Sequence, residues 1–212
     1  LRDGGKAFGG RDVLGAVSAI KTEIEPVLKG ADVREQAEID RLMIELDGTE
    51  KRSRIGGNAI IATSMAVLNA AAAAEKLPLW RYLRQMQENN EAETLPLPEI
   101  QIFGGGAHAA RRVDIQDFMI TAIGATNYVQ ALEWSAEVYR HAGMIMANSG
   151  RLHGVADEGG YWPAFDSNEE AIETLVRAIE NAGYTPGQEI AISLDIAASE
   201  FGQNGKYTLA HD

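Results

Sequence analysis

The spacing of apolar residues changes once along the chain, near residue 90, and this change limits the fold more than any other feature. Apolar side chains recur at helical spacing in residues 11–29, 33–47, 56–76 and 78–87. A polar, acidic stretch at 88–94 follows and is the predicted linker. Beyond it, strand and helix patterns alternate. A helical region followed by such alternation indicates an α/β architecture with a helical domain in front.

The second region is predicted in more detail from its caps and turns. Strands are predicted at 95–103, 114–124, 151–160 and 189–199, and helices at 127–149 and 167–183. Ser167 and Glu170 form a capping-box pattern, and Asn204-Gly205 indicates a hairpin turn. The apolar strand at 189–199 is expected to be covered on both faces. The alanine-rich stretch at 56–76 is expected to be a helix buried on most sides.

Composition excludes several classes of protein. The formal net charge is -12 over 212 residues, so a nucleic-acid or anionic-membrane partner is not expected. The chain has no cysteine, which excludes disulfide scaffolds, thiolate zinc sites and cysteine nucleophiles. No apolar run approaches the roughly 20 residues that span a bilayer, so no membrane span is expected.

The glycine-rich segment 104–118 is the first candidate site. Three glycines allow the backbone to approach a ligand closely, and His108, Gln116 and Asp117 follow them. A flexible turn that happens to carry a histidine explains this pattern equally well.

Two further segments carry acids at predicted strand ends. Asp157 and Glu158 precede two glycines, where they could bind a metal or exchange protons, although Asp and Gly also favour ordinary turns. Asp195 interrupts an apolar strand, and a buried carboxylate needs a cation, a metal or hydrogen-bond donors. A divalent metal and a buried salt bridge are both open explanations. We expect all three segments to meet at the carboxyl ends of parallel strands.

Read in order, four motifs resemble the enolase family. They are LDGTEKRSRIGGNAIIATSMAVLNAAAAAEKLPLWRYL at 46–83, the segment 95–125 with its histidine loop, VADEGGYWP at 155–163, and ISLDIAASEF at 192–201. The resemblance implies that residues 1–90 are the helical part of an α+β N-terminal domain. It also implies that residues 91–212 are the first half of an enolase-type α/β barrel, with four of its eight strands.

The resemblance also implies roles for the matched residues. Glu158 corresponds to the acid that protonates the departing hydroxyl group, and Asp195 to a magnesium (Mg²⁺) ligand. His108, Gln116 and Asp117 correspond to residues that contact the substrate. The implied reaction is the reversible dehydration of 2-phosphoglycerate to phosphoenolpyruvate in glycolysis. A cytoplasmic homodimer or higher homo-oligomer is the expected form, although family members also serve at the cell surface as receptors.

Several positions depart from the family pattern. Asp117 stands where the family has Glu, Ala156 replaces a Gly, and Tyr161-Trp162 replaces Phe-Ala, while Ala110, Arg111 and Arg112 replace small or Asn-rich residues. A divergent enzyme for another phosphorylated or phosphonate acid is therefore the alternative, and a non-catalytic binding protein is a third hypothesis. The lysine base and the remaining metal ligands of the family are not in these 212 residues. We therefore expect a fragment that has no turnover alone.

Overall fold

The computed structural model of the protein describes residues 2–87 and 93–211. The chain divides into two compact units, Leu1–Ala92 and Glu93–Asp212. The predicted boundary between residues 90 and 91, and most of the predicted linker, lie outside the described residues, so they stay predictions. Each unit is described separately below.

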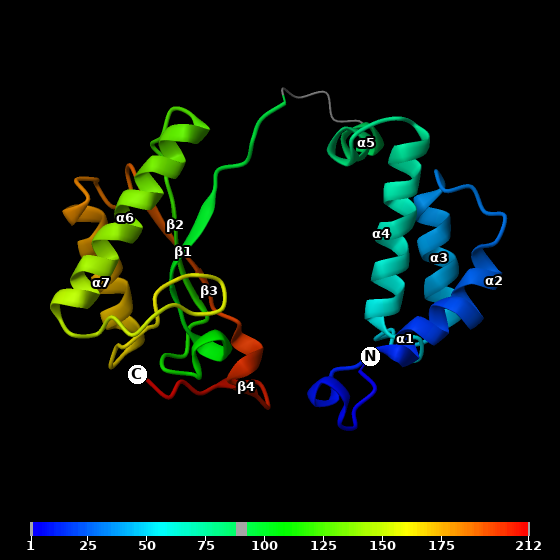
Figure 1. The fold of residues 1–212 in the computed structure, drawn as a ribbon, viewed down its shortest axis with the longest axis horizontal. Helices are drawn as coiled ribbons and strands as arrows, with labels where there is room; N and C mark the ends of the chain where they lie inside the picture. Colours follow the sequence, from blue (N-terminus) through cyan, green and yellow to red (C-terminus); the bar gives the residue numbers. More distant parts are fainter. Residues whose placement is uncertain (1, 88–92, 212) are drawn as a thin grey trace. The chain divides into compact units, whose positions relative to one another are not determined.

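The first unit is helical, as its apolar spacing predicts (Figure 1). A short 3-10 helix, Ala7–Gly10, precedes the four predicted helices. The first of these consists of α1 (Leu14–Ala19), a π-helical turn (Ile20–Ile24) and α2 (Glu25–Leu28), and the other three are α3 (Gln36–Asp47), α4 (Gly57–Ala74) and α5 (Leu79–Met86). Its main buried cluster includes Ile24, Ile39, Met43 and Ile55.

Helix α4 is less buried than its composition predicts. Ile61 and Met65 expose 59% and 58% of their surfaces, so the expectation of burial on most sides is wrong for this unit. Alanine makes the helix apolar all round, but the first unit buries only part of that surface. Within the described residues α4 is also the one helix long and apolar enough to cross a membrane, with a mean hydropathy of 1.4. Core helices of soluble proteins meet the same criterion, so this finding is weak evidence for a span.

A buried aspartate organises the turn after α3. Asp47 is 2% exposed, and one of its carboxylate oxygens accepts hydrogen bonds from the backbone and the hydroxyl group of Thr49. The other oxygen accepts one from the backbone N–H of Ile55 at 2.7 Å. Burial opposes ionisation, yet these donors outweigh it and lower the pKa of Asp47 to about 2. The motif at 46–49 thus joins α3 to the segment that leads into α4.

Replacing Asp47 by alanine should lower the melting temperature of the first unit by roughly 5–10 °C, because the buried N–H of Ile55 loses its acceptor. The stabilisation that the ionised Asp47 carboxylate gives the folded state is fully present above the unfolded pKa of about 3.9. It is lost as the pH falls towards 2, the pKa in the folded protein. The difference between the variant and the parent protein should therefore shrink over that interval in calorimetry. Glu38→Ala is the control, because the Glu38 side chain is 50% exposed in its ion pair with Arg41. Equal losses in the two variants would contradict the prediction.

The second unit contains a three-stranded sheet and two helices (Figure 1). The strands are β1 (Glu99–Gly104), β2 (Asp117–Thr121) and β3 (Ala191–Asp195), in that order in the sheet. The helices are α6 (Tyr128–Asn148) and α7 (Asn168–Asn181), and short 3-10 helices cover Gly106–Ala109 and Ala198–Glu200. The predicted hairpin forms as β4 (Gly202–Gln203) and β5 (Lys206–Tyr207) around Asn204-Gly205.

Two predictions for this unit need correction. Residues 151–160 form no strand, only an isolated bridge between Val155 and Tyr161, so the sheet has three of the four predicted strands. The helix cap is also altered: Ser167 accepts from the N–H of Glu170, but the Glu170 carboxylate accepts from the N–H of Asp166 instead of that of Ser167.

The sheet is antiparallel, whereas the sequence led us to expect parallel strands. The connection from β1 to β2, residues 105–116, contains one 3-10 helix and no α-helix that could carry the chain back for a parallel pairing. Between β2 and β3 the chain passes through two helices, which return it to the end where β2 finished. The amino end of β2 therefore lies between the carboxyl ends of β1 and β3, and Asp117 pairs with both Gly104 and Asp195. The candidate residues still gather at one edge of the sheet.

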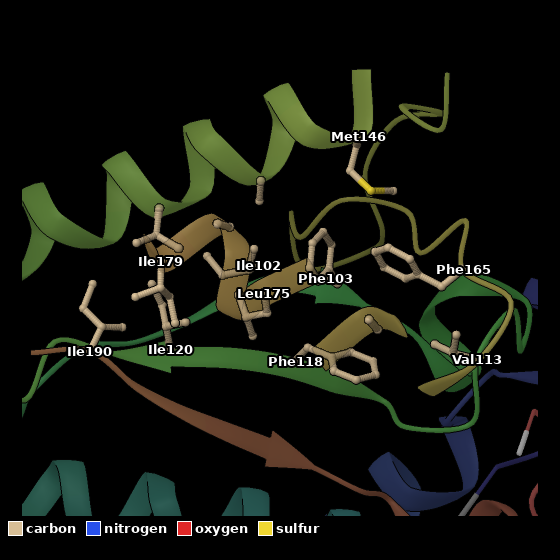
Figure 2. Close-up of a cluster of buried hydrophobic side chains, with 14 of the residues drawn as sticks. Ile102, Phe103, Val113, Phe118, Ile120, Met146, Phe165, Leu175, Ile179 and Ile190 are labelled. Atoms are coloured by element: carbon tan, nitrogen blue, oxygen red, sulfur yellow. The ribbon is translucent and has the colours of Figure 1, made fainter. Parts of the chain in front are cut away.

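The two faces of the sheet differ in character. Cross-strand partners share a face, so Ile100, Ile120 and Ile192 lie on the side that packs against α6 and α7. Figure 2 shows this core, in which Phe118 and Ile120 of the sheet lie near Leu175 and Ile179 of α7. The opposite face is mainly polar and carries Glu99, Gln101, Asp117, Thr121, Ser193 and Asp195. The expectation that β3 is covered on both faces is not met in this unit, since every residue of β3 is at least partly exposed.

Candidate active site

The loop between β1 and β2 is closed by backbone hydrogen bonds and by close contacts at its glycines. The N–H of Gly105 donates to Gln116 O at 2.6 Å, and that of Gly106 donates to Val113 O at 3.1 Å. A Cβ on Gly105 would lie 2.3 Å from the backbone oxygen of Ile115, so the close approach requires glycine. His108 sits on the 3-10 helix inside this loop.

Asp114 and Asn168 attach the loop to the rest of the unit. The side-chain oxygen of Asn168 accepts from the backbone N–H groups of Asp114 and Ile115, and its amide donates to the Asp114 carboxylate at 3.0 Å. The N–H groups of Ala210 and His211 also donate to that carboxylate. Burial opposes ionisation of Asp114, but these donors outweigh it and lower its pKa. The loop thereby keeps one conformation against the start of α7.

The turn that carries Asp157 and Glu158 is attached to the end of β1. The N–H of Tyr161 donates to Ile102 O at 2.8 Å, and the N–H of Gly104 donates to Tyr161 O at 3.2 Å. From the helix side, the hydroxyl group of Tyr139 on α6 donates to Gly159 O at 2.8 Å. The turn is therefore held between the sheet and α6.

His108 lies between the two acids of this turn. Its Nδ1 is 3.6 Å from Asp157 Oδ2, and its Nε2 is 3.9 Å from Glu158 Oε1. His108, Asp117 and Glu158 each offer one ligand atom, and these atoms all lie within 4.8 Å of one another. Among the described residues this group could hold a metal ion. The loop between β1 and β2 that carries His108 (the histidine loop) and the turn that carries Asp157 and Glu158 (the acidic turn) thus contribute to one site, as the sequence predicts.

A hydrogen-bonded series extends from this group to β3. Gln101 Nε2 donates to Asp117 Oδ1 and, at 3.3 Å, to Glu158 Oε2. Gln116 Nε2 lies 3.3 Å from Asp117 Oδ2 and 3.4 Å from Asp195 Oδ2. Glu158 and Asp195 are therefore linked through two amides and the 4% exposed Asp117. Sequence reasoning missed Gln101, although a polar residue within an apolar strand was a usable signal.

Asp195 is exposed at the end of β3, so the expectation that its carboxylate is buried is wrong. Within the described residues it forms no ion pair, which removes the salt-bridge explanation there. Its donors are the backbone N–H of Ala197 at 3.0 Å and the amide of Gln116. Its carboxylate offers oxygen atoms of the kind that hard divalent cations prefer, but Asp195 lies outside the group of His108, Asp117 and Glu158 and supplies one ligand residue by itself.

The packing explains two of the departures from the family pattern. Ala156 fills space that Gly104 leaves free, since a Cβ on Gly104 would lie 2.6 Å from the Ala156 Cβ. Tyr161 stacks on Tyr139 with ring centroids 4.3 Å apart, and a Cβ on Gly143 would lie 2.3 Å from its hydroxyl oxygen. Burial, together with the neighbouring Tyr139, raises the pKa of Tyr161 to about 12.

Arg111, a third residue that departs from the family pattern, has an ion-pair partner in the structure. Arg111 forms an ion pair with Glu200 at 2.7 Å, which joins the histidine loop to the 3-10 helix after β3. Nothing in the structure explains the bulk of Trp162.

Comparison with known families agrees with these observations. A family model described as the enolase N-terminal domain matches residues 1–83, and one described as the enolase C-terminal TIM barrel domain matches residues 92–212. Both matches lie in the order that the motifs predict. They confirm the predicted fold class, an α/β enolase-type barrel portion preceded by the helical portion of the N-terminal domain. The chain therefore belongs to the enolase family.

Proposed function

We propose that this protein serves as a magnesium-dependent lyase that dehydrates 2-phosphoglycerate to phosphoenolpyruvate. Membership of the enolase family supports a lyase. The observation that carries the proposal is the series from Glu158 through Gln101, Asp117 and Gln116 to Asp195. It brings a carboxyl proton donor and a cation-binding carboxylate to one edge of the sheet, as the reaction requires.

The arrangement suggests a role for each side chain. Glu158 has one oxygen held by Gln101, and its other oxygen, on the His108 side, is available to pass a proton to the departing hydroxyl group. His108 and Gln116 would contact the substrate, and Asp117 would keep the Gln116 amide in place. Asp195 would help to hold Mg²⁺, which when bound offsets the negative charge that builds up on the substrate carboxylate.

A second substrate class is favoured by two observations. Asp117 is one methylene shorter than the family's Glu, and its carboxylate is already occupied by two amides. Arg111 adds a guanidinium within the histidine loop, where it pairs with Glu200 at 2.7 Å. These two departures from the family pattern are the reason to keep another phosphorylated or phosphonate acid as the alternative substrate. Steady-state kinetics on the complete protein would separate the candidates, and absence of phosphoenolpyruvate formation from 2-phosphoglycerate would exclude the first.

Asp195→Asn should raise the Mg²⁺ concentration needed for half-maximal turnover of the complete protein by about tenfold or more, because a charged oxygen ligand is lost. Isothermal titration of Mg²⁺ into the same variant provides a readout that does not depend on activity. Asp166→Asn is the matched control, because the Asp166 side chain is 91% exposed and pairs only with Arg151 among the described residues. Unchanged Mg²⁺ binding in Asp195→Asn would exclude Asp195 as a ligand.

A further inference from the structure

Gln101 makes more contacts at the site than any role assigned so far explains. It lies on β1, on the polar face of the sheet, opposite Met119 of β2. Its Oε1 accepts from the N–H of Gly160 at 2.8 Å, while its Nε2 donates to Asp117 Oδ1 and approaches Glu158 Oε2 at 3.3 Å. One side chain thus contacts the acidic turn twice and the buried aspartate once.

The orientation of this amide follows from its surroundings. A Cβ on Gly160 would lie 2.5 Å from Gln101 Oε1, and a Cβ on Gly104 would lie 3.1 Å from both polar atoms of the Gln101 amide. The side chain therefore lies in a slot that two glycines leave open. Because the N–H of Gly160 needs an acceptor, the amide oxygen faces Gly160 and the amide nitrogen must face the carboxylates.

The consequence is a fixed position for the Glu158 carboxylate. An amide nitrogen has two hydrogens, and here each has a carboxylate acceptor, one from Asp117 and one from Glu158. Asp117 is nearly fully buried, so it provides a rigid support for the amide. Glu158 is exposed and would otherwise adopt several side-chain rotamers. Holding one of its oxygens leaves the other directed towards the His108 side of the site.

We propose that Gln101 is a positioning residue that aims the free oxygen of Glu158 at the ligand beside His108. This inference rests on the proposed function of Glu158 as a proton donor. Gln101 also supports the backbone of the turn through the Gly160 N–H, whereas Tyr139 supports the same turn through Gly159 O without contacting the carboxylate. The two contacts can therefore be removed separately.

The first test compares turnover of Gln101→Leu and Tyr139→Phe in the complete protein. Gln101→Leu should lower kcat by about 10- to 100-fold and leave KM within about threefold, since misdirection of a catalytic group affects the chemical step. Tyr139→Phe should change kcat by less than about threefold. Gln101→Glu keeps the size but removes both donors, so it should not restore kcat. Equal losses of kcat in the leucine and phenylalanine variants would overturn the proposal.

The second test does not depend on activity and uses NMR of the 212-residue chain. The two side-chain amide protons of Gln101 should exchange slowly and resonate apart from those of the exposed Gln188. Glu158→Leu should shift one of them and leave the Gly160 N–H in place. If both amide protons behave like those of Gln188, the inference is wrong. If the complete protein forms no phosphoenolpyruvate but these signals are found, the proposed function fails and the contact stands.

Discussion

Glu158→Gln in the complete protein is expected to lower kcat by about a thousandfold or more and to leave the fold intact. General acid catalysis contributes about 10²- to 10⁴-fold to a rate, and a neutral amide cannot supply the proton that leaves with the hydroxyl group. The side chain is largely exposed and makes one hydrogen bond to Gln101, so its loss should not disturb packing. Formation of phosphoenolpyruvate, followed by its ultraviolet absorbance, measures the effect.

Glu169→Gln is the matched control for this substitution. Glu169 is an exposed acid in the first turn of α7, so the same change of charge occurs in the same unit but outside the candidate site. We expect its kcat to stay within about twofold of the parent value, since surface substitutions of this kind have small effects. Circular dichroism would show whether both variants are folded. A folded Glu158→Gln protein with full turnover would refute the acid role.

Gly105→Ala should destabilise the second unit by about 3 kcal/mol or more, because the added methyl group cannot be accommodated. The new Cβ would lie 2.3 Å from the Ile115 backbone oxygen and 2.6 Å from Val113 Cγ2. The backbone has little freedom to move away, since the Gly105 N–H donates to Gln116 O at 2.6 Å. Any shift that relieves the contact also displaces His108 and Gln116, so the site should be lost together with stability.

Denaturation by urea, followed by the hydrogen exchange of amides in the second unit, measures this loss. Gly57→Ala provides the comparison. Apart from its chain neighbours and the backbone of its own helix, no atom of the described residues lies within 4 Å of its added Cβ, and Gly57 opens α4 with an ordinary backbone conformation. This variant should be as stable as the parent or slightly more stable. A Gly105→Ala protein with unchanged stability would mean that the loop is more adaptable than its contacts indicate.

The sequence alone was sufficient for the features that depend on neighbouring residues. Apolar spacing predicted the helices of the first unit and α6 and α7 of the second. A helix that buries one face repeats its apolar residues every three or four positions, so the pattern is visible within a few turns. Local hydrogen bonding likewise predicted the N-cap at Ser167, whose hydroxyl oxygen accepts from the N–H of Glu170. The four matched motifs indicated the enolase family, which the spacing of apolar residues could not reveal.

Features that depend on contacts between distant segments were decided only by the tertiary structure. The direction of β3 relative to β2 depends on how two helices return the chain to the sheet. The exposure of α4 and of Asp195 depends on which surfaces the rest of each unit covers. Gln101 meets Gly160 and Glu158 across nearly sixty residues, a closeness that no local pattern encodes. The sequence therefore allowed the candidate residues of the site to be named in advance, apart from Gln101. Their orientation was determined by packing, because a side chain is fixed by the neighbours that fill the space around it.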